Sequence, residues 1–109
     1  MACSGAPDAS AGSAGSRLTV IAEDLRFSPT TLTADADAPF TIELDNRDRG
    51  IPHNVAIYRD PTTADPIVVG DVSIGEVRTA HRVDALPAGS YFFRCDVHRL
   101  DMTGVLEVR

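Results

Sequence analysis

The chain has no tryptophan and no lysine, and only 6% of its residues are aromatic. All 10 basic residues are arginines, and 16 acidic residues leave a formal net charge of −6. Nucleic acids require a basic surface, so we exclude a general nucleic-acid partner. No apolar run is long enough to cross a membrane.

Cysteine is also scarce, with 2 residues in 109. A disulfide between Cys3 and Cys95 would tie a polar tail to the end of a strand, so we expect no such bridge and no disulfide scaffold. The length predicts one domain that is large enough to bury a core without covalent staples.

Residues 1–16 are rich in Ala, Ser and Gly, which is typical of a flexible linker. We therefore predict a tail at 1–16 and a domain at 17–109. Cys3 follows a small residue, as at the mature start of a bacterial lipoprotein, and would then tether the domain to a membrane. The other interpretation is a disordered tail with an incidental thiol, and both stay open. No hydrophobic segment of a complete signal peptide is present.

Short segments with alternating apolar and polar residues follow the tail, and no segment of useful length has a helical period. We predict strands at Phe40–Asn46, His53–Tyr58 and Val77–Val83, and a short buried segment at 67–69. On the last strand, the residues expected to face the core are Met102, Gly104, Leu106 and Val108. Many short strands separated by turns predict an all-β sandwich.

One loop near the end of the domain places Cys95, His98 and Met102 close together in the sequence. A thiolate, an imidazole and a thioether suit copper far better than magnesium or calcium. His53, at the start of a strand, supplies a second imidazole. Two His and one Cys in a plane with a weak axial Met define a mononuclear blue-copper site.

Each of these residues has an ordinary structural explanation when it is taken alone, and only their combination indicates a metal site. Zinc is the main competitor for Cys and His, but a structural zinc site normally has more of these ligands, and Met suits zinc poorly. A dinuclear copper centre would need two bridging cysteines. We interpret His81, which lies well before the ligand loop, as structural.

The ligand segments resemble those of the cupredoxins, and of plastocyanin in particular. The pattern joins Gly50-Ile51-Pro52-His53-Asn54 to the segment from Tyr91 to Gly104, and the similarity covers about residues 17 to 109. The resemblance implies a Greek-key β-sandwich of about eight strands, one type 1 copper ion and single-electron transfer.

The resemblance also implies roles for residues around the ligands. Asn54 should join the two ligand segments and point its backbone N–H at the sulfur of Cys95. Asp96 and Val97 stand where plastocyanins commonly have a hydroxyl residue and a proline. We expect the carboxylate of Asp96 to be solvated and the N–H of Val97 to reach the sulfur.

Electrons should enter and leave through the edge of His98, where protein redox partners would dock. The apolar residues that we expect around it are Leu25, Ile51, Pro52 and Leu100. Arg99, together with Arg47 and Arg49, could ring this patch and select an acidic partner. We favour the interpretation that these arginines are solvated and paired with Asp48 and Asp101.

Together these observations predict a monomeric carrier of single electrons, with one copper ion that cycles between Cu(I) and Cu(II), and not an enzyme. We expect it outside the cytoplasm, in the periplasm or on the outer face of the cytoplasmic membrane. A periplasmic copper-binding or chaperone protein on the same fold is the first alternative. A metal-free interaction module is the second, although the intact ligand set argues against it.

Overall fold

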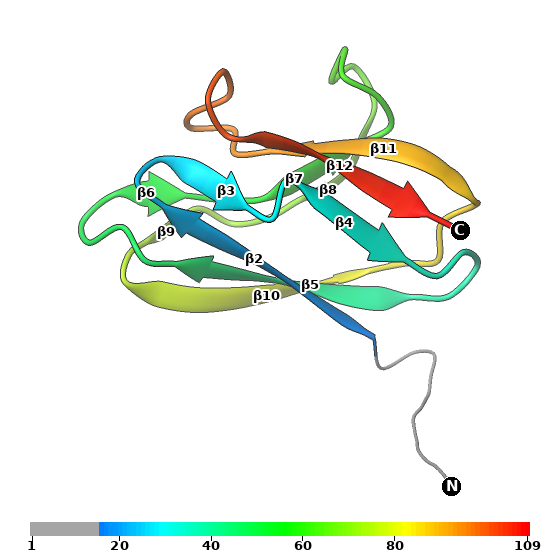
Figure 1. Ribbon diagram of the computed structural model, residues 1–109, viewed down its shortest axis with the longest axis horizontal. Coiled ribbons are helices and arrows are strands. Elements are labelled where there is room, and N and C mark those ends of the chain that lie inside the picture. Colours follow the sequence, from blue (N-terminus) through cyan, green and yellow to red (C-terminus); the bar gives the residue numbers. More distant parts are fainter. Residues whose placement is uncertain (1–15) are drawn as a thin grey trace, which may run out of the picture.

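The computed structural model describes residues 16–109, which form eleven β-strands (Figure 1). The strands are β2 (Arg17–Glu23), β3 (Arg26–Ser28), β4 (Thr31–Ala34), β5 (Phe40–Asn46), β6 (Pro52–His53), β7 (Ala56–Tyr58), β8 (Pro66–Val69), β9 (Ser73–Ile74), β10 (Val77–Val83), β11 (Gly89–Arg94) and β12 (Thr103–Val108). None of the described residues forms a helix that could span a membrane. Cys3 and the rest of the predicted tail up to residue 15 lie outside the described part, so that domain boundary stays a prediction.

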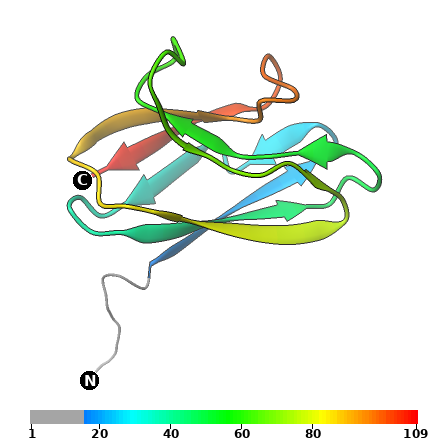
Figure 2. The same ribbon diagram turned by 180° about the vertical axis from the view of Figure 1, so that it is seen from behind.

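Two main sheets face each other as the layers of a sandwich (Figures 1 and 2). One has the strand order β10-β5-β2-β3 and the other β4-β12-β11-β7-β8, while β6 and β9 form a small separate pair. β2 runs parallel to β5 and β4 runs parallel to β12, while the other neighbours are antiparallel. The prediction of an all-β sandwich is confirmed.

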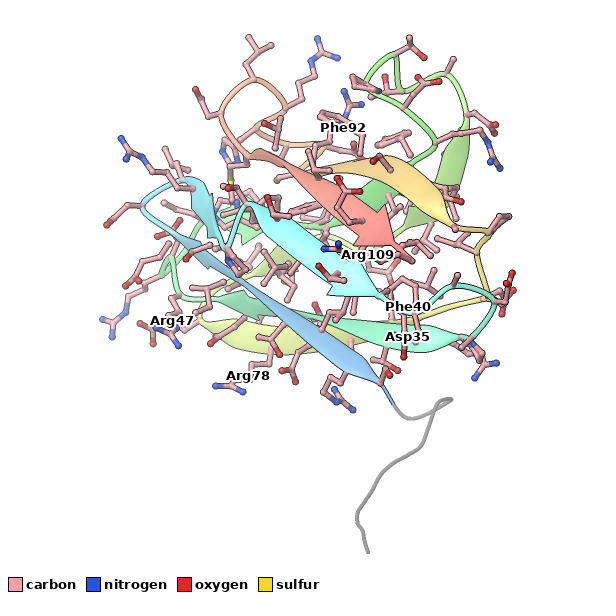
Figure 3. All side chains as sticks on the ribbon, turned by 45° about the vertical axis from the view of Figure 1, so that its right-hand side comes forward. Asp35, Phe40, Arg47, Arg78, Phe92 and Arg109 are labelled. Atoms are coloured by element: carbon pink, nitrogen blue, oxygen red, sulfur yellow. The ribbon has the colours of Figure 1, made fainter. Side chains whose placement is uncertain are left out.

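Alternation along the strands places the core between the two sheets. On β11, Tyr91 and Phe93 are buried while Phe92 and Arg94 keep partial exposure on the outer side. On β12, Gly104, Leu106 and Val108 are buried, as predicted. Phe92, Arg47 and Arg78 lie on the outside of the sandwich in Figure 3. Arg47 and Arg78 both pair with Asp45 on the four-stranded sheet.

Two predicted segments differ from the structure. The strand expected from His53 to Tyr58 is divided into β6 and β7, because Asn54 leaves the ladder and its side chain donates a hydrogen bond to the carbonyl of Gly70 at 3.0 Å. The segment 67–69 is only partly buried, because β8 lies at the edge of its sheet and Val69 is 58% exposed. The division at Asn54 brings His53 to the end of the sandwich where the ligand loop lies.

Candidate metal centre

His53 is fully buried at the end of β6, and its Nε2 lies 2.7 Å from Oδ2 of Asp48. A carboxylate can only accept a hydrogen bond here, so the ring proton is on Nε2. Nδ1 therefore keeps its lone pair, and it is the atom that faces Cys95. Hydrogen bonding on one ring nitrogen commonly fixes the orientation of a metal-ligating histidine.

Asp48 is itself held from a second side. Its carboxylate accepts hydrogen bonds from the backbone N–H of Asp24 at 2.7 Å and of Leu25 at 3.0 Å. Burial raises the pKa of Asp48, but the hydrogen bonds from His53 and from these two N–H groups outweigh it, so the pKa lies below its ordinary value. The carboxylate of Asp48 is therefore charged where it contacts Nε2 of His53.

The loop from Cys95 to Met102 is closed by its own backbone. The N–H of Cys95 donates to the carbonyl of Met102 at 2.9 Å, and the N–H of Met102 donates to the carbonyl of His98 at 3.1 Å. These bonds turn the chain back at His98 and start β12 directly after Met102. The spacing of Cys95, His98 and Met102 therefore corresponds to one tight turn between β11 and β12.

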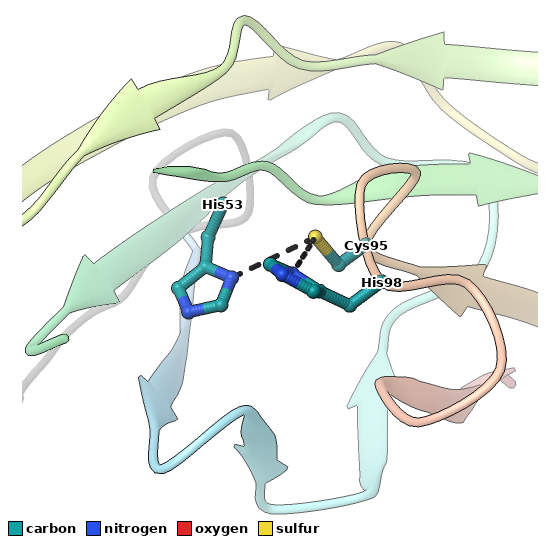
Figure 4. A group of neighbouring side chains, drawn as sticks. All are labelled: His53, Cys95 and His98. Carbon is teal, nitrogen blue, oxygen red and sulfur yellow. Dashed lines mark hydrogen bonds between the residues drawn. The ribbon is translucent and has the colours of Figure 1, made fainter. Parts of the chain in front are cut away.

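Cys95, His53 and His98 converge at one point (Figure 4). Their ligand atoms all lie within 4.8 Å of one another, and Sγ of Cys95 is 3.8 Å from Nδ1 of each histidine. First-row metal bonds of about 2.0 Å to nitrogen and about 2.3 Å to sulfur, at an angle of about 120°, separate the two atoms by about 3.7 Å. The observed spacing therefore fits one ion bound between the three atoms.

Burial and donor chemistry favour copper for this position. Cys95, His53 and Met102 are fully buried, while His98 keeps partial exposure. The rings of His53 and His98 meet edge to face, with centroids 4.9 Å apart. Thiolate, two imidazoles and a thioether are the donors of a blue-copper site. His53, Cys95, His98 and Met102 thus fit one copper ion.

Asn54 joins the two ligand segments, as the resemblance implied. Its Oδ1 accepts a hydrogen bond from the backbone N–H of Asp96 at 2.7 Å, and its Nδ2 lies 3.4 Å from Oδ2 of the same residue. Because Asn54 follows His53 and Asp96 follows Cys95, these contacts fix the two ligands relative to each other.

Asp96 is only partly solvated, since its side chain is 28% exposed, so the expectation of a solvated carboxylate holds only in part. Its Oδ1 accepts hydrogen bonds from the hydroxyl of Tyr58 at 2.7 Å and from Nε of Arg94 at 2.8 Å. Burial raises its pKa, but the hydrogen bonds from Tyr58, Arg94 and Asn54 outweigh this effect and lower the pKa. Tyr58 and Arg94 come from neighbouring strands, a pairing that the order of residues in the sequence does not show.

Within residues 16–109, the polar contacts of Sγ of Cys95 are with the Nδ1 atoms of His53 and His98, each at 3.8 Å. The proposed bonds from the N–H groups of Asn54 and Val97 are not among the observed ones, and they stay predictions. Val97 is 43% exposed on the loop.

Two functional residues were missed by the sequence reasoning. Asp48 was expected to pair with a loop arginine, but it is buried against His53, and Arg47 pairs with Asp45 instead. Asn46 is fully buried, and it donates to the carbonyls of Ile51 and Ser73 and accepts from the N–H of Asp48. An acidic residue five positions before a ligating histidine was the only available signal for Asp48.

The residues expected around His98 lie at or near the surface. Leu100 is 90% exposed and Leu25 is 38% exposed, while Ile51 and Pro52 keep partial exposure. Ile74 is 65% exposed and stands opposite Pro52 in the β6–β9 pair, so it extends this surface.

Within residues 16–109, Arg49 and Arg99 take part in no ion pair. Both are exposed, as expected, but their predicted pairing with Asp48 and Asp101 was wrong. His81 is half-buried, and its ring faces Gly70.

The fold and the donor set together define a cupredoxin. The family of cupredoxin-like domains matches residues 1–108, and the chain belongs to it. A search of the curated proteins gave no match.

Solved structures show the same fold. Auracyanin A, a "blue" copper protein from Chloroflexus aurantiacus, is 20% identical, with a TM-score of 0.77 over 87% of this chain and 99% of its own. Auracyanin from Roseiflexus castenholzii is 16% identical, with a TM-score of 0.77 over 89% and 99%. Amicyanin from Paracoccus versutus is 25% identical, with a TM-score of 0.62 over 84% and 80%.

Proposed function

We propose that the chain is a type 1 copper protein that carries single electrons between redox partners. The observation that carries this proposal is the buried group of Cys95 Sγ and two imidazole Nδ1 atoms, each 3.8 Å from the sulfur. The bound copper ion would supply the Cu(I)/Cu(II) couple. Met102, which is fully buried, would supply a thioether as the fourth donor.

The protein's part is to hold the four donors in one arrangement. Asp48 fixes the ring of His53, the backbone bonds of the loop fix His98 and Met102, and Asn54 joins the two segments. Rigid support of this kind keeps the donors in place when the charge of the ion changes. Four protein donors would occupy the coordination positions of one copper ion, so we propose a carrier and not an enzyme.

The exposed side chains near the loop from Cys95 to Met102 support the docking of a redox partner close to His98. His98 is the donor with partial exposure, and Leu100, Ile74 and Leu25 form an apolar surface around the loop. Such surfaces mark partner sites. Arg49 and Arg99 have no acidic partner within residues 16–109 and favour a redox partner with an acidic face. Association should then weaken as salt is added.

We also propose that the protein acts outside the cytoplasm as a monomer. A lipid tether at Cys3 belongs to the same proposal and would be tested by mass spectrometry of protein isolated from its native membrane. An added mass at Cys3 would support the tether, and an unmodified thiol would contradict it.

A Cu(II) titration followed by visible spectroscopy and voltammetry tests the proposed function. A carrier should develop an intense thiolate-to-copper band with one equivalent and show a reversible one-electron wave. A copper chaperone, the alternative, should instead transfer its ion rapidly to a competing chelator. Absence of both the band and the wave would overturn the carrier.

A further inference from the structure

Three side chains form a closed group next to the metal-binding thiolate. The guanidinium of Arg94 lies over the ring of Tyr58, 4.8 Å from its centroid, and both residues donate to Oδ1 of Asp96. Nη2 of Arg94 is also 3.4 Å from the hydroxyl of Tyr58. Arg94 and Asp96 directly flank Cys95, so one cation and one anion stand on either side of the sulfur in the sequence.

We propose that Arg94 and Tyr58 are positioning residues that hold Asp96 and balance its charge beside the metal, and thereby keep the reduction potential high. The inference rests on the proposed electron-carrier function. An uncompensated carboxylate next to the thiolate would stabilise Cu(II) over Cu(I) and lower the potential. Arg94, whose Nε lies 2.8 Å from this carboxylate, opposes that effect.

The partial burial of Arg94 and Asp96 strengthens the electrostatic effect of each charge on the other. The side chain of Arg94 is 18% exposed and that of Asp96 is 28% exposed, so water screens the pair only in part. The ion pair of Arg82 with Asp84 is much more open, because its side chains are 66% and 95% exposed. Exposed pairs of this kind contribute little.

The group also has a geometric role. Asp96 is bound to Asn54 through its backbone N–H at 2.7 Å and through its carboxylate at 3.4 Å. Tyr58 and Arg94 fix the carboxylate in the orientation that this contact needs. Loss of either residue would loosen the link between Cys95 and His53, in addition to changing the local charge.

Voltammetry of the copper-loaded protein tests the charge balance. In Arg94→Gln, the ratio of reduced to oxidised protein at a fixed applied potential should fall about tenfold, which corresponds to a shift of about 59 mV for one electron. Asp96→Asn should shift the potential in the opposite direction. The double variant should return close to the original value, because both charges are then absent.

Matched variants separate charge from general loss of structure. Arg82→Gln removes one arginine from an exposed pair on β10 and should leave the potential unchanged. Arg94→Lys keeps the charge and should restore most of the potential, while Tyr58→Phe removes one hydrogen bond and should give a smaller fall than Arg94→Gln. Unfolding of the metal-free variants reports separately how far each change loosens the fold.

The outcomes distinguish this inference from the proposed function. If the unaltered protein shows no charge-transfer band and no reversible wave, the carrier function fails. If the unaltered protein has both, but Arg94→Gln and Asp96→Asn move the potential in the same direction or not at all, the charge balance alone is overturned. Opposite shifts that cancel in the double variant support it, because a purely structural role would not produce opposite signs.

Discussion

Oδ2 of Asp48 lies 2.7 Å from Nε2 of His53, and the hairpin turn between β2 and β3 holds the carboxylate in place through two backbone hydrogen bonds. Asp24 and Leu25 at this turn have φ angles of 56° and 60°, the left-handed conformation that directs both of their N–H groups to Asp48. The orientation of one proposed metal ligand thus depends on a turn formed by a distant segment. Leu25 is also 38% exposed and belongs to the proposed docking surface, so this turn would serve both docking and ligand orientation.

Replacement of Asp48 with Asn should weaken copper binding by about 10- to 100-fold, because the amide cannot accept all three hydrogen bonds that the carboxylate now accepts. Leaving buried donors unsatisfied should also lower the free energy of unfolding of the metal-free protein by about 1–3 kcal/mol. Chelator competition and chemical denaturation measure the two effects. Asp84→Asn, at an exposed acid, is the control. Equal copper affinity in both variants would contradict the role of Asp48.

Replacement of Cys95 with Ser should abolish the visible charge-transfer band while the fold remains. Cys95 is fully buried, and a hydroxyl occupies nearly the same volume as a thiol, so the core should keep its packing. Far-ultraviolet circular dichroism checks the fold, and the visible spectrum with Cu(II) checks the site. A variant that keeps the intense band would remove Cys95 from the ligand set.

Changes at Met102 should move the reduction potential in opposite directions. Gln should lower it, because an amide oxygen favours Cu(II) more than a thioether does, whereas Leu should raise it by removing the axial donor. Met102 is fully buried, so Leu also serves as the packing control. Voltammetry that finds one potential for all three proteins would show that Met102 does not act on the metal.

The sequence predicted the parts of the molecule that depend on local order. The β-sandwich, the limits of β10 and the inward face of β12 follow from alternation, which needs no knowledge of distant contacts. The four proposed ligands could be identified because their donor chemistry is rare as a set. His53 alone lies far from the others in the sequence, and the Pro-His-Asn pattern marked it.

The surroundings of the ligands could not be predicted in the same way. An aspartate in a turn-rich segment is normally solvated, so its spacing from His53 was the only local signal that could set Asp48 apart from the exposed Asp101. Its burial depends on where β2 and β3 pack. The contact between Tyr58 and Asp96 likewise follows from the pairing of β7 with β11, which the alternation of either strand does not specify.

Gly104 should tolerate no side chain, although its backbone is ordinary strand. A Cβ at this position would lie 2.5 Å from Cε1 of Phe93 and 2.6 Å from the carbonyl oxygen of Thr30. Neither neighbour can move easily, because Phe93 is fully buried against Phe27, with centroids 5.6 Å apart, and the Thr30 carbonyl accepts the N–H of Val105 at 2.8 Å.

We therefore expect Gly104→Ala to lower the free energy of unfolding of the metal-free protein by about 1–3 kcal/mol, the usual cost of overpacking a core. Val105→Ala, at the exposed neighbour on the same strand, should change it by only about 0.5 kcal/mol. Because Gly104 follows Met102 by two residues, a strand displaced by the new methyl group should also shift the axial donor and alter the visible spectrum. Equal denaturation midpoints for the two variants would show that the Phe93 ring has room to move, and that β12 does not depend on a glycine here.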